Sequence, residues 1–349
     1  MIPQKLYDIL EKAKKRERLT KEECKYILSF PAESLESSMI RSVSNELIRE
    51  KMDNSGIVIG QVGVDIHPCK ANCGFCSLGE EHACIPTIKL DKPALEKAIK
   101  EFTRDGDLYG LYLMTMADTD QEYLLDMVRF ARSVAPADTQ IWVNTGDNEK
   151  EFYEKLVEAG AVGAYHVCRV GEGVTTKLDP EQRVQTMKNI IDAGLELYSC
   201  VEPIGPETSI DELVEKIYVC IDLGVTQFGA MKRVAVPGSP LAVHGEISNL
   251  QMAHVMGCVG LVYGSVENAK FFGVHEPCES GYLAGANFAT AETGVNPRDT
   301  VVDTSKGRGW DLGRCRKLLF DCGFTHLMKG DGTKITLDRA YLEKTDSLF

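Results

Sequence analysis

Short apolar runs alternate with amphipathic stretches along most of the chain beyond residue 57. Runs rich in Val, Ile and aromatic residues are typical of buried strands, and apolar residues at helical spacing are typical of helices that pack one face on a core. The predicted strands are 57–66, 108–114, 140–144, 163–169, 196–201, 227–234, 270–274 and 287–291. The predicted helices between them are 92–104, 121–133, 149–159, 181–193, 211–223, 250–263 and 311–322.

Three predicted helices end in a glycine suited to a helix C-cap, namely Gly160, Gly194 and Gly224, and a strand follows soon after each. Repeated β-then-α units of this kind favour an α/β fold, a (β/α)8 TIM-type barrel, over the alternative of a doubly wound open sheet. Residues 1–50 have a helical pattern. We therefore expect a helical N-terminal extension over 1–50 and a barrel domain over 51–349.

Composition and charge argue against some classes of partner but do not identify a substrate. The chain has 349 residues, a formal net charge of −13 and no basic block, so we expect no nucleic-acid partner. Its apolar runs are too short to cross a bilayer, and the N-terminus lacks the apolar core of a signal peptide. We expect no membrane partner and a cytoplasmic location. In a reducing compartment the twelve cysteines should be thiols or metal ligands.

Three of these cysteines are closely spaced directly after the first predicted strand. Cys69, Cys73 and Cys76 have the spacing Cys-x3-Cys-x2-Cys. Thiolates are the usual ligands of iron–sulfur clusters, and three of them leave one iron of a [4Fe–4S] cluster open for a substrate. A zinc site completed by His67, His82 or Cys84 is the alternative, and unliganded thiols are a further one.

This spacing, with the aromatic Phe75 before the last cysteine, resembles the signature of the radical S-adenosylmethionine (SAM) superfamily. The resemblance implies that SAM binds the open iron and that one electron cleaves it to methionine and a 5′-deoxyadenosyl radical. That radical then removes a hydrogen atom from a substrate carbon. The expected cofactors are the [4Fe–4S] cluster and SAM, and the expected partner is a one-electron reductant such as ferredoxin or flavodoxin.

From about residue 46 to residue 324 the chain resembles the group containing biotin synthase, the hydrogenase maturase HydE and methylornithine synthase. Asp179-Pro-Glu-Gln-Arg-Val184 is similar to a helix start whose arginine, here Arg183, meets the SAM carboxylate. The turns at 202–208 and 234–240 are similar to adenine-binding turns. The cofactor-binding residues implied by the resemblance are Phe75, Met114, Thr115, Glu172, Arg183, Ile204 and Val236. The chain departs from the group after the second strand, where Met114-Thr-Met-Ala-Asp118 replaces a Gly-Gly-Glu-like element, and again after the fourth strand.

Three further cysteines, Cys168, Cys200 and Cys278, fall near the carboxyl ends of the fourth, fifth and seventh predicted strands. Sulfur-inserting members of the superfamily hold an auxiliary iron–sulfur cluster at this end of the barrel. Two interpretations stay open: an auxiliary cluster on these residues, or buried thiols that pack as small hydrophobic groups.

Polar residues in the late loops are the candidates for substrate contact, because active sites lie at the carboxyl face of such barrels. They are His275, Glu276 and Arg298. The leading hypothesis is a radical SAM enzyme acting on a small or carrier-bound substrate, with sulfur insertion into a lipoyl- or biotin-type precursor favoured. The alternatives are a HydE-like maturase or carbon-skeleton rearrangement in cofactor biosynthesis, and a non-enzymatic iron–sulfur or zinc protein.

Overall fold

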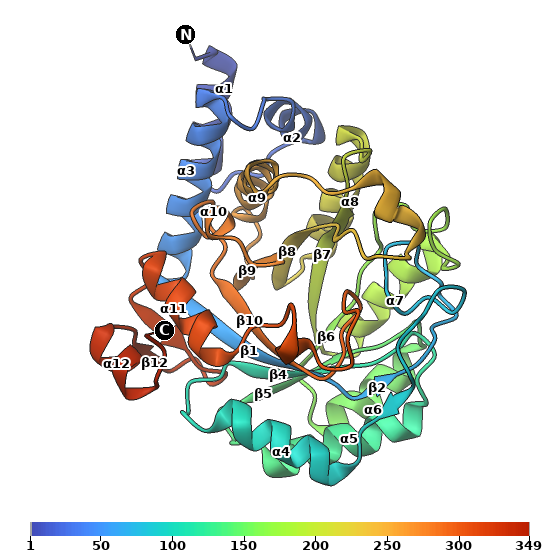
Figure 1. Ribbon diagram of the computed structural model, residues 1–349. Helices are drawn as coiled ribbons and strands as arrows, with labels where there is room; N and C mark the ends of the chain where they lie inside the picture. The colour runs from blue at the N-terminus through green and yellow to red at the C-terminus, as the bar shows by residue number, and fades with distance from the viewer. Residues whose placement is uncertain (1, 349) are drawn as a thin grey trace.

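The computed structural model describes residues 2–348 and contains a closed barrel of eight parallel strands (Figure 1). The strands pair in the order β1-β4-β5-β6-β7-β8-β9-β10, and β10 closes the barrel on β1. Their bounds are β1 Ser55–Gly63, β4 Gly110–Met114, β5 Gln140–Asn144, β6 Gly163–Tyr165, β7 Glu196–Ile204, β8 Gln227–Lys232, β9 Phe271–His275 and β10 Phe288–Thr293. The predicted (β/α)8 fold is therefore confirmed, and the doubly wound sheet is excluded.

The outer layer consists of the helices that connect these strands. They are α4 Lys92–Thr103, α5 Gln121–Val134, α6 Lys150–Ala159, α7 Pro180–Asp192, α8 Ile210–Leu223, α9 Asn249–Tyr263, α10 Glu279–Tyr282 and α11 Leu312–Asp321. Each helix predicted between the strands is present, and each of its ends lies within one residue of the predicted position. Gly160 and Gly224 adopt the left-handed conformation at the ends of α6 and α8, as expected for C-cap glycines.

One gap in the outer layer is filled from the N-terminus. The connection from β9 to β10 carries only the short helix α10. Three helices precede β1 in the chain, namely α1 Gln4–Lys14, α2 Lys21–Leu28 and α3 Leu35–Lys51. Helix α3 packs along α9, and Figure 1 shows it beside α9 and α10. The buried Ser44 hydroxyl on α3 donates a hydrogen bond to Ala284 O, 2.7 Å away. The division of the chain near residue 50 stays a prediction.

Two small additions were not predicted. After β1 the chain forms a hairpin of β2 (Asp65–Ile66) and β3 (Ile88–Lys89), which frames the cysteine loop. At the C-terminus, β11 (His326–Met328) pairs with β1, and β12 (Lys334–Thr336) and α12 (Arg339–Lys344) follow. Two 3-10 turns, η1 (Pro240–His244) and η2 (Thr304–Lys306), lie in the loops after β8 and β10. Within residues 2–348, no helix is both long and apolar enough to span a membrane.

Large aromatic side chains fill the barrel interior. Tyr112 stacks on Trp142 with 5.2 Å between ring centroids, and both are almost completely buried. A Cβ atom at Gly163 would lie 2.2 Å from the Trp142 ring, so glycine at this position makes room for the indole. Inside the barrel, space for ligands lies toward the carboxyl ends of the strands, where the long loops lie.

Candidate cofactor and substrate site

The cysteine loop lies at the carboxyl ends of the barrel strands. It is fixed there by backbone hydrogen bonds to several other loops. Gly74 N donates to Thr175 O in the loop after β6, at 2.8 Å, and Ser77 N donates to Pro297 O in the loop after β10, at 2.9 Å. Gly74 O accepts from Leu241 N after β8 at 2.8 Å. The loop is therefore held at both ends by the barrel and at its tip by three neighbouring loops.

Cys69, Cys73 and Cys76 line one cavity of about 610 Å³, together with Phe75 and Arg183. Cys73 is buried, and Cys69 and Cys76 are half-buried beside it. Burial raises the pKa of the Cys73 thiol to about 11 and that of the Cys76 thiol to about 12. Both thiols must therefore lose a proton when they ligate a metal, so loading of the site releases protons.

The residues present fit a [4Fe–4S] cluster better than a zinc ion. Cys69, Cys73 and Cys76 line the cavity together, whereas the candidate fourth zinc ligands His67, His82 and Cys84 are not part of its lining. Structural zinc needs four such ligands converging on one ion. A cubane cluster instead binds each thiolate to a different iron, which suits three cysteines spread along one cavity wall.

Arg183, on the first turn of α7, reaches the same cavity. Its side chain is only 4% exposed. Nε donates to Val167 O at 2.9 Å, and Nη1 donates to Asp147 Oδ1 at 3.1 Å. Although burial opposes it, hydrogen bonding from His166 and the charge of Arg183 hold the pKa of Asp147 below its usual range. These contacts fix the guanidinium beside the cysteines. They involve Nε and Nη1 and not Nη2.

A second cavity of about 620 Å³ lies deeper in the barrel and adjoins the first. Both cavities are lined by Phe75, Asn144, Tyr165, Arg169 and Pro297. The deeper cavity is also lined by Tyr112, Tyr198, Glu202, Met231, His275 and Arg298. The molecule therefore offers two connected compartments, one beside the cysteines and one enclosed by the barrel strands.

Arg169 stands at the boundary of the two cavities and was not singled out in the sequence. Its guanidinium lies 5.8 Å from the centroid of the Phe75 ring. Nε lies 3.4 Å from Glu202 Oε1, but the buried Nε has no hydrogen-bond partner within residues 2–348. A buried donor without a partner is costly, so a ligand that accepts from it would be stabilised here.

The three predicted substrate residues lie close together at the wall of the deeper cavity. His275 and Arg298 line it, and Glu276 is ion-paired with Arg298. Burial, with the positive charge of Arg298 adding to it, lowers the pKa of His275 to about 4. The histidine is therefore a neutral group near pH 7, and its Nε2 is hydrogen-bonded to the Tyr198 hydroxyl.

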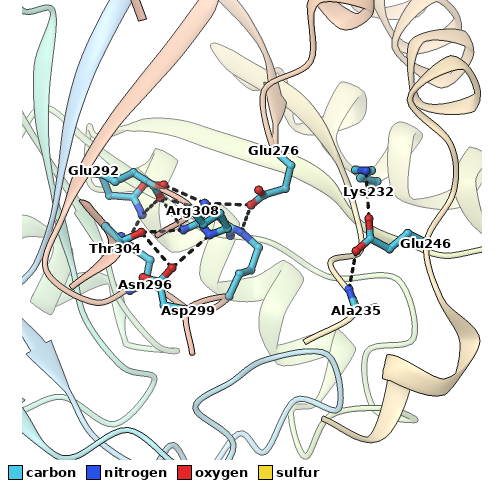
Figure 2. Close-up of polar contacts among 11 residues, drawn as sticks. Lys232, Ala235, Glu246, Glu276, Glu292, Asn296, Asp299, Thr304 and Arg308 are labelled. Atoms are coloured by element: carbon cyan, nitrogen blue, oxygen red, sulfur yellow. Dashed lines mark hydrogen bonds and ion pairs between the residues drawn. The ribbon is translucent and has the colours of Figure 1, made fainter. Parts of the chain in front are cut away.

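Behind Arg298 a network of charges fixes the loop after β10 (Figure 2). Arg308 lies 2.9 Å from Glu292, 3.1 Å from Glu276 and 3.2 Å from Asp299. The Thr304 hydroxyl donates to Asp299 at 3.0 Å. Arg308 therefore anchors this loop against β9 and β10 and is not a solvated side chain.

Of four other residues predicted to bind the cofactor, two line a cavity and two do not. Met114 lines the deeper cavity, and Thr115 lines the one beside the cysteines. Ile204 and Val236 are buried, and neither is part of the lining of either cavity. Their expected adenine contacts stay predictions.

Glu172 has its carboxylate engaged within the protein. It accepts from Arg169 N at 2.9 Å and from the Thr176 hydroxyl at 2.7 Å, and it lies 3.6 Å from Arg183 Nε. Its side chain is completely buried. Its carboxylate therefore contacts Arg169 and Arg183 within the protein, and its expected role in cofactor binding stays a prediction.

The structure does not bring Cys168, Cys200 and Cys278 together. The Cys168 thiol lies 3.5 Å from Lys216 Nζ on α8, outside the strands. Cys200 packs with Val167 and Met231. Cys278 begins α10, where the Ser280 hydroxyl lies 3.6 Å from its sulfur. Each thiol thus has different neighbours, and none of the three lines either cavity. The auxiliary cluster and the packing of buried thiols both stay predictions.

The closed barrel and the cysteine loop at its carboxyl face are the arrangement expected of a radical SAM protein. No protein-family model matches the chain. Biotin synthase from Clostridium perfringens is 24% identical over 258 residues, which cover 70% of this chain and 74% of that protein.

Two solved structures share the fold. Methylornithine synthase (PylB) superposes with a TM-score of 0.76 at 15% identity, covering 90% of this chain and 96% of that one. The hydrogenase maturase HydG from Carboxydothermus hydrogenoformans gives a TM-score of 0.75 at 15% identity, covering 92% and 79%. The resemblance to the radical SAM superfamily, and within it to the group of biotin synthase and methylornithine synthase, is thereby confirmed.

Proposed function

We propose that the chain is a radical SAM enzyme that activates a C–H bond of a substrate held inside the barrel. The observation that carries this proposal is the meeting of Cys69, Cys73, Cys76 and Arg183 in one cavity that adjoins a second, enclosed one. When bound, the [4Fe–4S] cluster and SAM supply the reductive cleavage that yields a 5′-deoxyadenosyl radical. The chain itself supplies ligands, orientation and exclusion of water.

Each group beside the cysteines has a distinct task in this proposal. The three thiolates hold three irons and leave the fourth open. Arg183 donates to the SAM carboxylate through a planar fork that suits two oxygens, because its position is already fixed by Val167 and Asp147. Phe75 lines both cavities, so an adenosyl group beside it would place its reactive carbon at the boundary between them.

The deeper cavity is the proposed substrate site. Aromatic side chains with a few polar groups line it, as is typical of small-molecule sites, and the end of a chain carried by another protein is a second candidate occupant. Arg169, Arg298 and Glu202 place charges of both signs on its wall, so we propose a polar substrate. Because Cys168, Cys200 and Cys278 lie apart, we favour rearrangement or fragmentation of the substrate over sulfur insertion from a protein-bound cluster.

Iron content tests the ligand assignment. After anaerobic reconstitution, the wild-type chain should hold about four irons and an equal amount of sulfide, as expected for one [4Fe–4S] cluster. A variant with Cys69, Cys73 and Cys76 all replaced by alanine should hold almost none. Cys84→Ala is the matched control, because Cys84 is an exposed cysteine of the same loop. Retention of a full cluster by the triple variant, or its loss from the control alone, would contradict the assignment.

A further inference from the structure

Tyr198 is the central residue of an aromatic cluster at the inner end of the deeper cavity. It projects from β7, lines the cavity and is almost completely buried. Its ring centroid lies 4.9 Å from that of Tyr165, 5.3 Å from that of Phe288 and 6.3 Å from that of Tyr112. No role for this tyrosine follows from the cluster or SAM ligands described above.

The hydroxyl of Tyr198 has a specific partner. It is hydrogen-bonded to Nε2 of His275, whose ring lies partly stacked against the tyrosine at 5.8 Å between centroids. Burial raises the pKa of Tyr198 well above its usual value, so the phenol keeps its hydrogen. The neutral His275 is able both to accept and to return a proton at this position.

We propose that Tyr198 donates a hydrogen atom to carbon radicals formed in the cavity, and that His275 positions its hydroxyl and restores its proton. This inference rests on the proposed function. In the donation step a C–H bond forms and the phenolic O–H bond breaks, which leaves a tyrosyl radical. One electron from the reductant that the enzyme already requires, together with a proton passed through His275, then regenerates the phenol. Tyr198 is thus a catalytic residue, and His275 is a positioning residue.

The other two tyrosines of the cavity are less suited to this role. The Tyr112 hydroxyl donates to Gln227 Oε1 at 2.7 Å and is fixed toward the start of β8. Tyr165 lies at the boundary of the two cavities, but its hydroxyl has no hydrogen-bond partner within residues 2–348. Only Tyr198 combines access to the cavity with a neighbouring group that returns a proton.

Cleavage of SAM alone, reduced by dithionite in D2O, tests the proposal without knowledge of the substrate. In the absence of substrate the adenosyl radical takes a hydrogen atom from a donor in the cavity, and a phenolic hydroxyl in D2O carries deuterium. We expect most of the 5′-deoxyadenosine from the wild-type chain to contain one deuterium, measured by mass spectrometry. In Tyr198→Phe this label should be lost, while cluster content is retained. Tyr112→Phe and Tyr165→Phe, which remove the same group from the same cavity, should keep it.

A second measurement distinguishes hydrogen donation from a structural role. Samples frozen during cleavage should show an organic radical by EPR in the wild type, and its hyperfine pattern should collapse when the protein contains ring-deuterated tyrosine. The signal should be absent in Tyr198→Phe. Unlabelled 5′-deoxyadenosine from the wild type, or equal label in Tyr198→Phe, overturns this proposal but leaves the proposed function intact. If the reconstituted wild type forms no 5′-deoxyadenosine, both proposals fail.

Discussion

At the scale of single residues, Arg183 shows how an ordinary helix residue becomes part of a binding site. It lies on the first turn of α7, after the N-cap Asp179, and its side chain is held inward by hydrogen bonds to Val167 O and Asp147. These contacts remove most of the freedom of a long side chain before any ligand binds. A fixed guanidinium loses less entropy on binding a carboxylate than a mobile one, so its contribution to affinity is larger.

We expect Arg183→Lys to weaken SAM binding by about 10- to 100-fold, the equivalent of one lost charge-assisted hydrogen bond of about 1.5–3 kcal/mol. Lysine keeps the charge but loses the fork. Titration of the reconstituted protein with SAM measures this, with iron content as the check on folding. Arg316→Lys is the control, since Arg316 on α11 is equally buried, pairs with Asp107 and is not part of the lining of either cavity. Equal loss of affinity in the two variants would contradict a specific role for Arg183.

Some of the site was predictable from single residues and some was not. The cysteines and Arg183 were found because their spacing and local motif carry the signal. Arg169 was missed because β6 ends at Tyr165 and the residues beyond it no longer alternate regularly between inside and outside. The pairing of Tyr198 with His275 joins β7 to the end of β9, and no local pattern reports a contact between residues so far apart.

At the scale of elements, the contact between α3 and α9 requires the two helices of the outer layer to approach each other closely. Gly260 on α9 faces Ser44 on α3, and a Cβ atom at Gly260 would lie 2.0 Å from the Ser44 hydroxyl oxygen. The Phe272 ring lies 3.2 Å from the same point. The two helices approach closely only because this position has no side chain, so α3 depends on it to cover the barrel.

Gly260→Ala should therefore lower the free energy of unfolding by about 1–3 kcal/mol, the range for overpacking of a well-packed interior. Denaturant unfolding of the purified protein measures the change. Gly264→Ala, at the end of the same helix, is the control. Its φ is −56° and the nearest atom to the added Cβ is 3.3 Å away, so alanine should be accommodated there. A Gly260→Ala protein as stable as the control would show that α3 is not held by this contact.

The strands and long helices were predictable because each carries its own periodicity, and the turn glycines mark where helices end. The elements that were missed are short. α10 has four residues, β2 has two, and β11 and β12 have three each, which is too few for a period to be seen. The packing of α3 on the barrel as an outer helix could not be predicted from the sequence either. It depends on α10 being too short to cover that part of the barrel.

At the scale of the whole molecule, the barrel places the cysteine loop and the charged residues of the late loops at the same end. The loops after β1, β6, β8 and β10 are joined by backbone hydrogen bonds around the cysteines. The charges of Arg298, Arg308, Glu276 and Glu292 close the opposite side of the cavity. Hydrogen bonds and ion pairs therefore fix the loops around both cavities, so the groups that line them are held in place before a ligand binds.

The central claim is that this chain cleaves SAM reductively at a cluster on Cys69, Cys73 and Cys76. The most direct test is to incubate the reconstituted protein with SAM and dithionite under anaerobic conditions and to quantify 5′-deoxyadenosine and methionine. We predict equal amounts of the two products from the wild type and from Cys84→Ala, and neither product from the triple alanine variant. A wild-type protein that holds its cluster but leaves SAM intact, or a triple variant that cleaves SAM as well as the wild type, would contradict the account.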